Sequence, residues 1–152
     1  MRVPTEADWG EWRSDVDCVA AHDRFAGTSR EEATRRFGHG DIIERIDEVR
    51  FMPLAPLRFY LLALCDYVRS PEALGNPDPR SLAGSFLALV QEKLDTVPET
   101  MRPVLGGVMT AVEYVASHQK RFGIPTSSTG ATLRRLRRLA TLAGWSPSAE
   151  KS

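Results

Sequence analysis

The side chains that most often carry chemistry are scattered along this sequence of 152 residues. They are three histidines and two cysteines: His22, His39, His118, Cys18 and Cys65. A zinc or iron site requires such ligands at close spacing, and the sequence contains no H-x-x-x-H or H-E-x-x-H pair. It also contains no G-x-S-x-G turn and no complete phosphate-binding loop. We therefore expect no metal, no cofactor and no catalytic residue.

Simple structural roles account for the cysteines and for one histidine. Cys18 and Cys65 lie in apolar helical patterns, where a free cysteine usually behaves as a small buried hydrophobic residue. A disulfide or a reactive thiol is the alternative. His39 stands between Gly38 and Gly40, and we interpret it as a solvent-exposed turn residue.

Carboxylates gather on two of the predicted helices. They are Asp8, Glu11, Asp15, Glu44, Asp47 and Glu48. Charge on the outer face of an amphipathic helix commonly serves only to keep that face solvated. The alternative is an acidic docking surface for a basic partner, because clustered charge of one sign accelerates encounter and rejects wrong partners.

A further charged group interrupts an otherwise apolar helix. Arg58, Asp66 and Arg69 fall on one edge of that helix, and Asp66 is spaced to pair with Arg69. Together with Tyr60 and Tyr67 they form either a small pocket, which is the enzymatic alternative, or a structural network.

The two ends of the sequence differ in charge. Residues 1–119 carry 13 basic and 19 acidic side chains, a net charge of −6, whereas residues 120–152 carry 7 and 1, a net charge of +6. Four arginines surround a row of leucines in the basic part: Arg134, Arg135, Arg137 and Arg138. Such a helix docks on the acidic body or on a second copy, binds nucleic acid or another partner, or stays a loose tail. The leucine row favours docking.

Helices must position all of these residues. Capping residues and apolar spacing predict helices at residues 5–26, 29–37, 42–50, 57–69, 79–97, 104–122 and 132–143. Residues 51–56, which contain Pro53 and Pro56, are predicted to be extended, and residues 124–131 are predicted to be a linker. The helix over 57–69 is apolar nearly all round, which indicates a central helix that is buried on most sides.

The spacing also predicts which side chains are buried. In the first helix these are Trp9, Trp12, Val16, Val19 and Ala20. In the third helix the apolar face is Ile42, Ile43, Ile46 and Val49, opposite Glu44, Arg45, Asp47 and Glu48. Gly106 and Gly107 each cost their helix about 1 kcal/mol relative to alanine, and close approach of a neighbouring helix would explain them.

The fold class follows from these patterns. No segment alternates apolar and polar residues as a strand does, so we predict an all-α protein with about six helices around the central one. Residues 1–123 would form the core domain, and residues 124–152 the linker and basic C-terminal helix. The longest uncharged run around the central helix, Phe59 to Cys65, is far shorter than the roughly 20 residues of a membrane span. With no secretory signal in view, a cytoplasmic location is expected.

The stretch "RFMPLAPLRFYLLALCDYV" resembles a motif of small bacterial proteins of unknown function. The matching residues are Phe51, Met52, Pro53, Pro56, Leu57, Arg58, Phe59, Tyr60, Leu61 and Ala63. The similarity extends from about Trp9 to Phe122 and leaves the basic tail outside. Proteins of this kind resemble the immunity proteins found beside polymorphic toxins.

The leading functional hypothesis is therefore a non-enzymatic protein-interaction module. Within that class we expect an immunity protein that binds and neutralises a cognate toxin, its acidic surface meeting the basic surface of the toxin. The alternative is a nucleic-acid-associated or regulatory protein that uses the arginine-rich helix. No interaction with a membrane is expected.

Overall fold

The structure is a computed structural model that describes residues 1–147. Within these residues the chain forms α-helices and short 3-10 helices (η) and no strands, which confirms the all-α prediction. The short helices are η1 (Glu6–Trp9), η2 (Trp12–Ser14), α5 (Pro71–Leu74), α7 (Pro98–Met101), η3 (Arg102–Val104) and α9 (Gln119–Phe122). The longer helices are α1 (Val16–Phe25), α2 (Arg30–Arg36), α3 (Ile42–Arg50), α4 (Leu54–Val68), α6 (Pro79–Thr96), α8 (Leu105–Ser117) and α10 (Thr126–Leu142).

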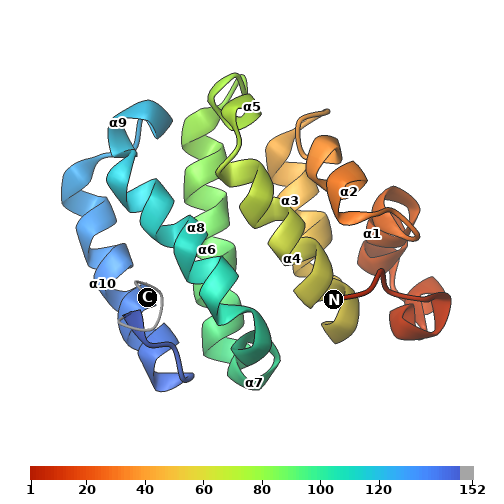
Figure 1. The fold of residues 1–152 in the computed structure, drawn as a ribbon. Helices are drawn as coiled ribbons and strands as arrows, with labels where there is room; N and C mark the ends of the chain where they lie inside the picture. The colour runs from red at the N-terminus through yellow and green to blue at the C-terminus, as the bar shows by residue number, and fades with distance from the viewer. Residues whose placement is uncertain (148–152) are drawn as a thin grey trace.

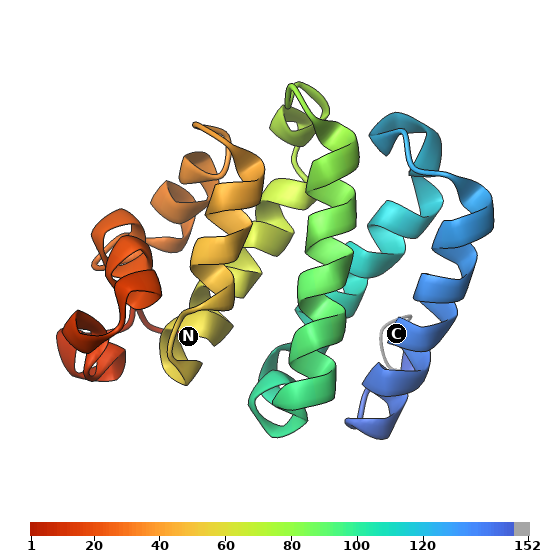
Figure 2. The same cartoon turned by 180° about the vertical axis from the view of Figure 1, so that it is seen from behind.

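The longer helices lie side by side in two layers (Figures 1 and 2). In the first layer α1 contacts α3, α3 contacts α6, and α6 contacts α10. In the second layer α2 contacts α4, and α4 contacts α8. The row therefore has α1 at one end and α10 at the other, and one continuous apolar core lies between its layers.

Helix α4 is the central helix that the sequence predicts. It contacts α2, α3 and α8, and ten of its fifteen residues are buried. Its start differs from the prediction, because α4 begins at Leu54 and the extended segment does not continue to residue 56. Pro56 is accommodated since it lies in the first helical turn, where its missing N–H costs no helical hydrogen bond.

The prediction of one continuous helix over residues 5–26 is wrong, because η1, η2 and α1 occupy this range. Gly10 has a φ of +59°, a left-handed conformation that ends η1, and Asp15 caps a new helix by accepting a hydrogen bond from the Asp17 amide. This break changes which side chains face the core. Trp9 is buried as predicted, but Val16 is 86% exposed, Ala20 is also exposed, and the buried residues of α1 are Cys18, Ala21 and Phe25.

Within the second layer, α4 and α8 approach each other closely. A Cβ atom on Gly107 would lie 2.7 Å from Leu62 Cδ2, so this glycine permits the close approach that the sequence suggests. The predicted helix over 104–122 is interrupted at His118, which separates α8 from α9, and Gly123 ends α9 in a left-handed conformation.

The basic tail is docked on the body. Helix α10 begins at Thr126, so the predicted linker over 124–131 is wrong for most of its length. Leu133, Leu136 and Ala140 are buried, and the helix contacts both α6 and α8. The end of the tail, residues 148–152, lies outside the described residues.

Candidate functional site

The first group of predicted partner-binding carboxylates divides into caps and surface charges. Asp8 completes the capping box of η1, whose N-cap is Thr5: the Asp8 carboxylate accepts from the Thr5 amide at 2.7 Å and from the Thr5 hydroxyl at 3.1 Å. These hydrogen bonds lower the pKa of Asp8. Asp15 caps α1 and remains exposed, as does Glu11. Asp8 therefore has a local structural role, whereas Glu11 and Asp15 present charge to solvent.

The second group divides into one buried carboxylate and two surface charges. Glu48 is buried, which corrects the prediction that it lies on the outer face of its helix. Arg45, also predicted to be outside, is buried beside it and donates from Nη1 to both Glu48 carboxylate oxygens, at 2.5 and 2.8 Å. Ile43 takes the exposed place instead. Glu44 and Asp47 remain at the surface, where Asp47 Oδ1 lies 3.0 Å from Arg50 Nη1.

Glu11 and Asp15 border a pocket of about 290 Å³, which we call the N-terminal pocket. Its wall comes from η1, η2, the start of α1 and the segment that joins α3 to α4: Trp9, Gly10, Glu11, Trp12, Asp15, Cys18, Phe51, Met52 and Pro53. Two carboxylates thus stand beside a group of aromatic and aliphatic side chains. Phe51, Met52 and Pro53 are also the first residues of the sequence motif.

Trp12 is held in place at this pocket by partners that are distant in sequence. Its ring stacks on the His22 imidazole, with ring centroids 3.6 Å apart and an angle of 7° between the planes. Its indole N–H donates to Glu6 Oε1 at 2.9 Å, and His22 Nε2 lies 2.9 Å from both Glu6 oxygens. The hydrogen bond with His22 is the largest cause of a lowered pKa at Glu6. A ring that is already held in one position loses little conformational entropy when a partner binds.

Two exposed apolar side chains belong to the pocket wall or follow it directly in the sequence. Phe51 is 43% exposed, and Leu54, the first residue of α4, is 53% exposed. Among the described residues, neither Glu11 nor Asp15 forms an ion pair. We define the N-terminal surface as Glu11, Trp12, Asp15, Phe51 and Leu54. Its apolar centre and acidic border are the chemical features of a protein-binding surface.

The predicted pocket around Arg58 and Tyr60 does not form as proposed. Tyr60 is fully buried, and its hydroxyl donates to the backbone oxygens of Phe25 and Thr28 at 2.8 and 3.1 Å. Asp66 does not pair with Arg69. It binds Arg30 of α2, whose Nε and Nη2 donate to the two carboxylate oxygens at 2.6 and 2.9 Å, so this charge joins two helices.

Asp66 and Tyr67 instead line a different cavity, of about 630 Å³, between α2, α4 and α5. His39 lies on its wall and is exposed, in agreement with its interpretation as a turn residue. Asn76 donates to the Tyr67 hydroxyl at 2.9 Å. Arg58 and Tyr60 are not part of this wall. The five residues that were predicted as one group therefore do not line a common pocket.

The four tail arginines also separate. Arg135 lies 3.5 Å from Asp95 of α6, and Arg137 donates to both oxygens of Glu113 of α8 at 2.6 and 2.8 Å. Arg134 and Arg138 are exposed. Two arginines are thus engaged with acidic residues of the body, which leaves less charge for phosphate groups than the sequence suggests.

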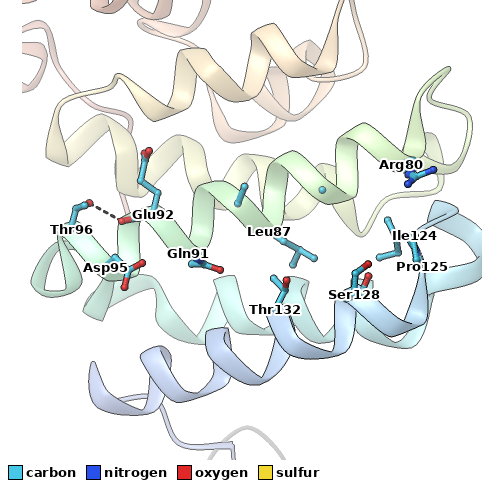
Figure 3. Close-up of a pocket in the computed structure, with 13 residues that line it drawn as sticks. Arg80, Leu87, Gln91, Glu92, Asp95, Thr96, Ile124, Pro125, Ser128 and Thr132 are labelled. Carbon is cyan, nitrogen blue, oxygen red and sulfur yellow. Dashed lines mark hydrogen bonds between the residues drawn. The ribbon is translucent and has the colours of Figure 1, made fainter.

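A groove of about 610 Å³ follows the line along which α10 docks on α6 (Figure 3). Arg80 and Ile124 lie at one end, Asp95 lies at the other, and Leu87 and Thr132 lie between them. Asp95 is already close to Arg135, and we interpret the groove as the packing seam between α6 and α10.

The two cysteines, which could carry chemistry, lie in the apolar core. Cys18 and Cys65 are both free and buried, as interpreted from the sequence. Burial raises the pKa of the Cys65 thiol, which keeps it protonated and unreactive. Among residues 1–147, no cluster of three or more histidine, cysteine or carboxylate side chains is arranged to hold a metal ion.

None of the helices in the described part of the chain has the length and apolar character needed to cross a membrane. Comparison of the chain with family models, with curated proteins and with solved structures gives no match.

Proposed function

We propose that this protein is a non-enzymatic protein-binding module and that the N-terminal surface is its binding site. The observation that carries the proposal is the placement of Glu11 and Asp15, without ion-pair partners among the described residues, beside the aromatic pocket that contains Trp12 and Phe51. Binding energy at protein interfaces concentrates in aromatic residues at the centre of the contact, surrounded by polar residues that exclude water.

The charge of this surface indicates the type of partner. Glu11 and Asp15 are followed by Asp17, which is also exposed, while Arg13 lies over the Trp12 ring, with its guanidinium carbon 4.4 Å from the ring centroid. The local balance is acidic, as it is over residues 1–119. A basic protein surface would be attracted to it and would meet the exposed side chains of Phe51 and Leu54.

Within this class we propose an immunity protein that neutralises a toxin by covering its basic substrate-binding surface. The support is the acidic border together with the sequence motif, whose Phe51, Met52 and Pro53 line the pocket. A toxin that acts on a polyanion needs a basic surface, and an acidic protein seated there competes with the substrate.

Co-expression with the products of the neighbouring genes tests the proposal, with rescue of growth and co-purification as readouts. The variant Glu11→Gln combined with Asp15→Ser removes both charges and retains a capping residue at position 15. We expect this variant to bind the toxin at least about tenfold more weakly, which corresponds to about 1.4 kcal/mol. Phe51→Ala should weaken binding in the same direction.

The matched control is Glu99→Gln, which removes an exposed carboxylate of α7 that lies outside the N-terminal surface. It should leave toxin binding unchanged. If no neighbouring product is bound and neutralised, the immunity function is wrong. If the Glu11 and Asp15 variant binds as tightly as the natural chain, the N-terminal surface is not the binding site.

A further inference from the structure

The two helical layers end differently on the side of the C-terminus. Helix α10 continues the first layer beside α6, whereas within residues 1–147 no helix continues the second layer beyond α8 (Figures 1 and 2). One flank of α8 therefore faces α10 without a neighbouring helix in its own layer.

A groove of about 810 Å³ occupies this position between α8 and α10, and we call it the α8–α10 groove. Met109 of α8 is fully buried in its wall, Trp145 lines it after the end of α10, and Leu142 of α10 borders it with 77% of its surface exposed. Leu142 and the partly exposed Trp145 together line one apolar surface, and contiguous apolar surfaces mark sites of interaction.

The rim of the groove is positively charged. Glu113 of α8 and Arg137 of α10 both line the groove and neutralise each other through two hydrogen bonds. Arg138 is exposed on the rim, and Arg134 lies one turn earlier on the same face of α10. Within the described part of the chain neither Arg134 nor Arg138 forms an ion pair, so their charge is available to a partner.

We propose that the α8–α10 groove binds an amphipathic helix of a partner protein, which takes the position of the next helix in the second layer. Apolar side chains of that helix, spaced by three and four residues, would contact Leu142 and Trp145 above the buried Met109. Acidic residues beside its apolar stripe would face Arg134 and Arg138.

The charges favour a partner protein over a second copy of this chain. In a two-fold symmetric pair the same patch meets itself, so the arginines of one α10 would face those of the other. That pairing places like charges close together and opposes association. An acidic helix from another protein meets no such repulsion.

A synthetic peptide of about 18 residues is a direct probe, since shorter helices are only marginally stable in water. It carries leucines along one face and glutamates on both sides of them, with a fluorescent label at one end. The matched control peptide has lysines in place of the glutamates. Fluorescence anisotropy with the full chain measures the affinity of each.

We expect the glutamate peptide to bind, the lysine peptide to bind at least tenfold more weakly, and added salt to reduce the difference. Leu142→Asp and Arg138→Glu should each weaken binding of the glutamate peptide at least tenfold. Val16→Asp, which alters an equally exposed apolar residue on α1 at the opposite end of the row, should have no effect. Circular dichroism confirms that each variant remains folded.

Three peptide-binding results would each overturn the proposal: no binding of the glutamate peptide, equal binding of both peptides, or binding that is unaffected by Leu142→Asp. A dimer in sedimentation that dissociates on Leu142→Asp would also overturn it, because a second copy would then cover the groove. Toxin binding at the N-terminal surface is unaffected by any of these outcomes.

Discussion

Arg137 of α10 and Glu113 of α8 form a two-pronged ion pair that fastens the C-terminal helix to the body, with N–O distances of 2.6 and 2.8 Å. The two side chains are 43% and 40% exposed, so solvent screens the pair and its contribution to stability is modest. Burial of Leu133, Leu136 and Ala140 provides the larger share of the docking energy.

Glu113→Gln should lower the free energy of unfolding by about 0.5–1 kcal/mol at neutral pH. Arg137 holds the pKa of Glu113 below its ordinary value of 4.5. Because the folded pKa is lowered, the contribution is fully present above pH 4.5 and is lost as the pH falls through the folded pKa. Urea denaturation across this range measures it. Arg138→Gln is the control, and a difference between Glu113→Gln and the natural chain that persists unchanged in acid would contradict the assignment.

Glu48→Ala should be much more costly than Glu44→Ala, although both carboxylates are on α3. Removing Glu48 leaves the buried Arg45 guanidinium without its main partner, at a cost of about 3 kcal/mol, whereas Glu44 is exposed and its loss should cost less than about 0.5 kcal/mol. Equilibrium denaturation compares the two. Equal effects would mean that Glu48 is not a structural residue. The double variant Arg45→Met with Glu48→Leu should recover most of the loss.

Tyr60→Phe should destabilise the fold by about 1–2 kcal/mol, because it leaves the backbone oxygens of Phe25 and Thr28 with one hydrogen bond fewer in a buried place. Tyr60→Ala should cost about 3–5 kcal/mol, since it also opens a cavity. Burial raises the pKa of Tyr60 above its ordinary value of 10.0. The stability is therefore fully present below pH 10.0 and is lost as the pH rises through the folded pKa. Thermal unfolding that is the same for Tyr60→Phe and the natural chain would refute this role.

The effect of Gly107→Ala on stability should depend strongly on the side chain at position 62. Alanine is favoured over glycine within a helix by about 1 kcal/mol, but its Cβ would lie 2.7 Å from Leu62 Cδ2 and would force that side chain to move. We expect the full gain only in the Leu62→Ala background and a smaller gain or a loss in the natural chain. A double-mutant cycle by urea denaturation measures the coupling. Identical effects in both backgrounds would show that the helices have more room there.

His22→Ala should raise the pKa of Glu6 towards its ordinary value of 4.5, because it removes the hydrogen bond that is the main cause of the lowered pKa. Titration of the Glu6 carboxyl carbon by NMR measures the change. Asp8, whose pKa is lowered by Thr5, is an internal reference and should titrate as before. A Glu6 pKa that does not move would mean that His22 and Glu6 are not in contact in solution.

Local patterns predict much of this fold. Ser29, Asp41 and Asp78 act as helix caps, as their types and positions indicate, because a cap depends only on the next few residues. The prediction of α4 as the central helix is also confirmed. The first predicted helix fails because local signals compete there: Gly10 and the Asp15 cap divide it and change its buried face.

The candidate site could be predicted only in part. Glu11 and Asp15 stand out by charge, and Phe51 belongs to the motif, but no spacing rule brings Phe51 next to Trp12. The pairing of Trp12 with His22 also has no local signal, because the two residues belong to different elements.

By itself the sequence determined an all-α protein, most of its helices, the central position of α4 and the acidic and basic ends of the chain. Helical periodicity, capping and charge depend on residues that are near one another in the sequence, so they can be predicted without the tertiary structure. Only the tertiary structure decided that Asp66 pairs with Arg30, that Glu48 is buried with Arg45, and that the second layer ends at α8 beside an apolar groove. Those relations depend on how helices pack against one another, and packing is fixed by the shape of the whole core.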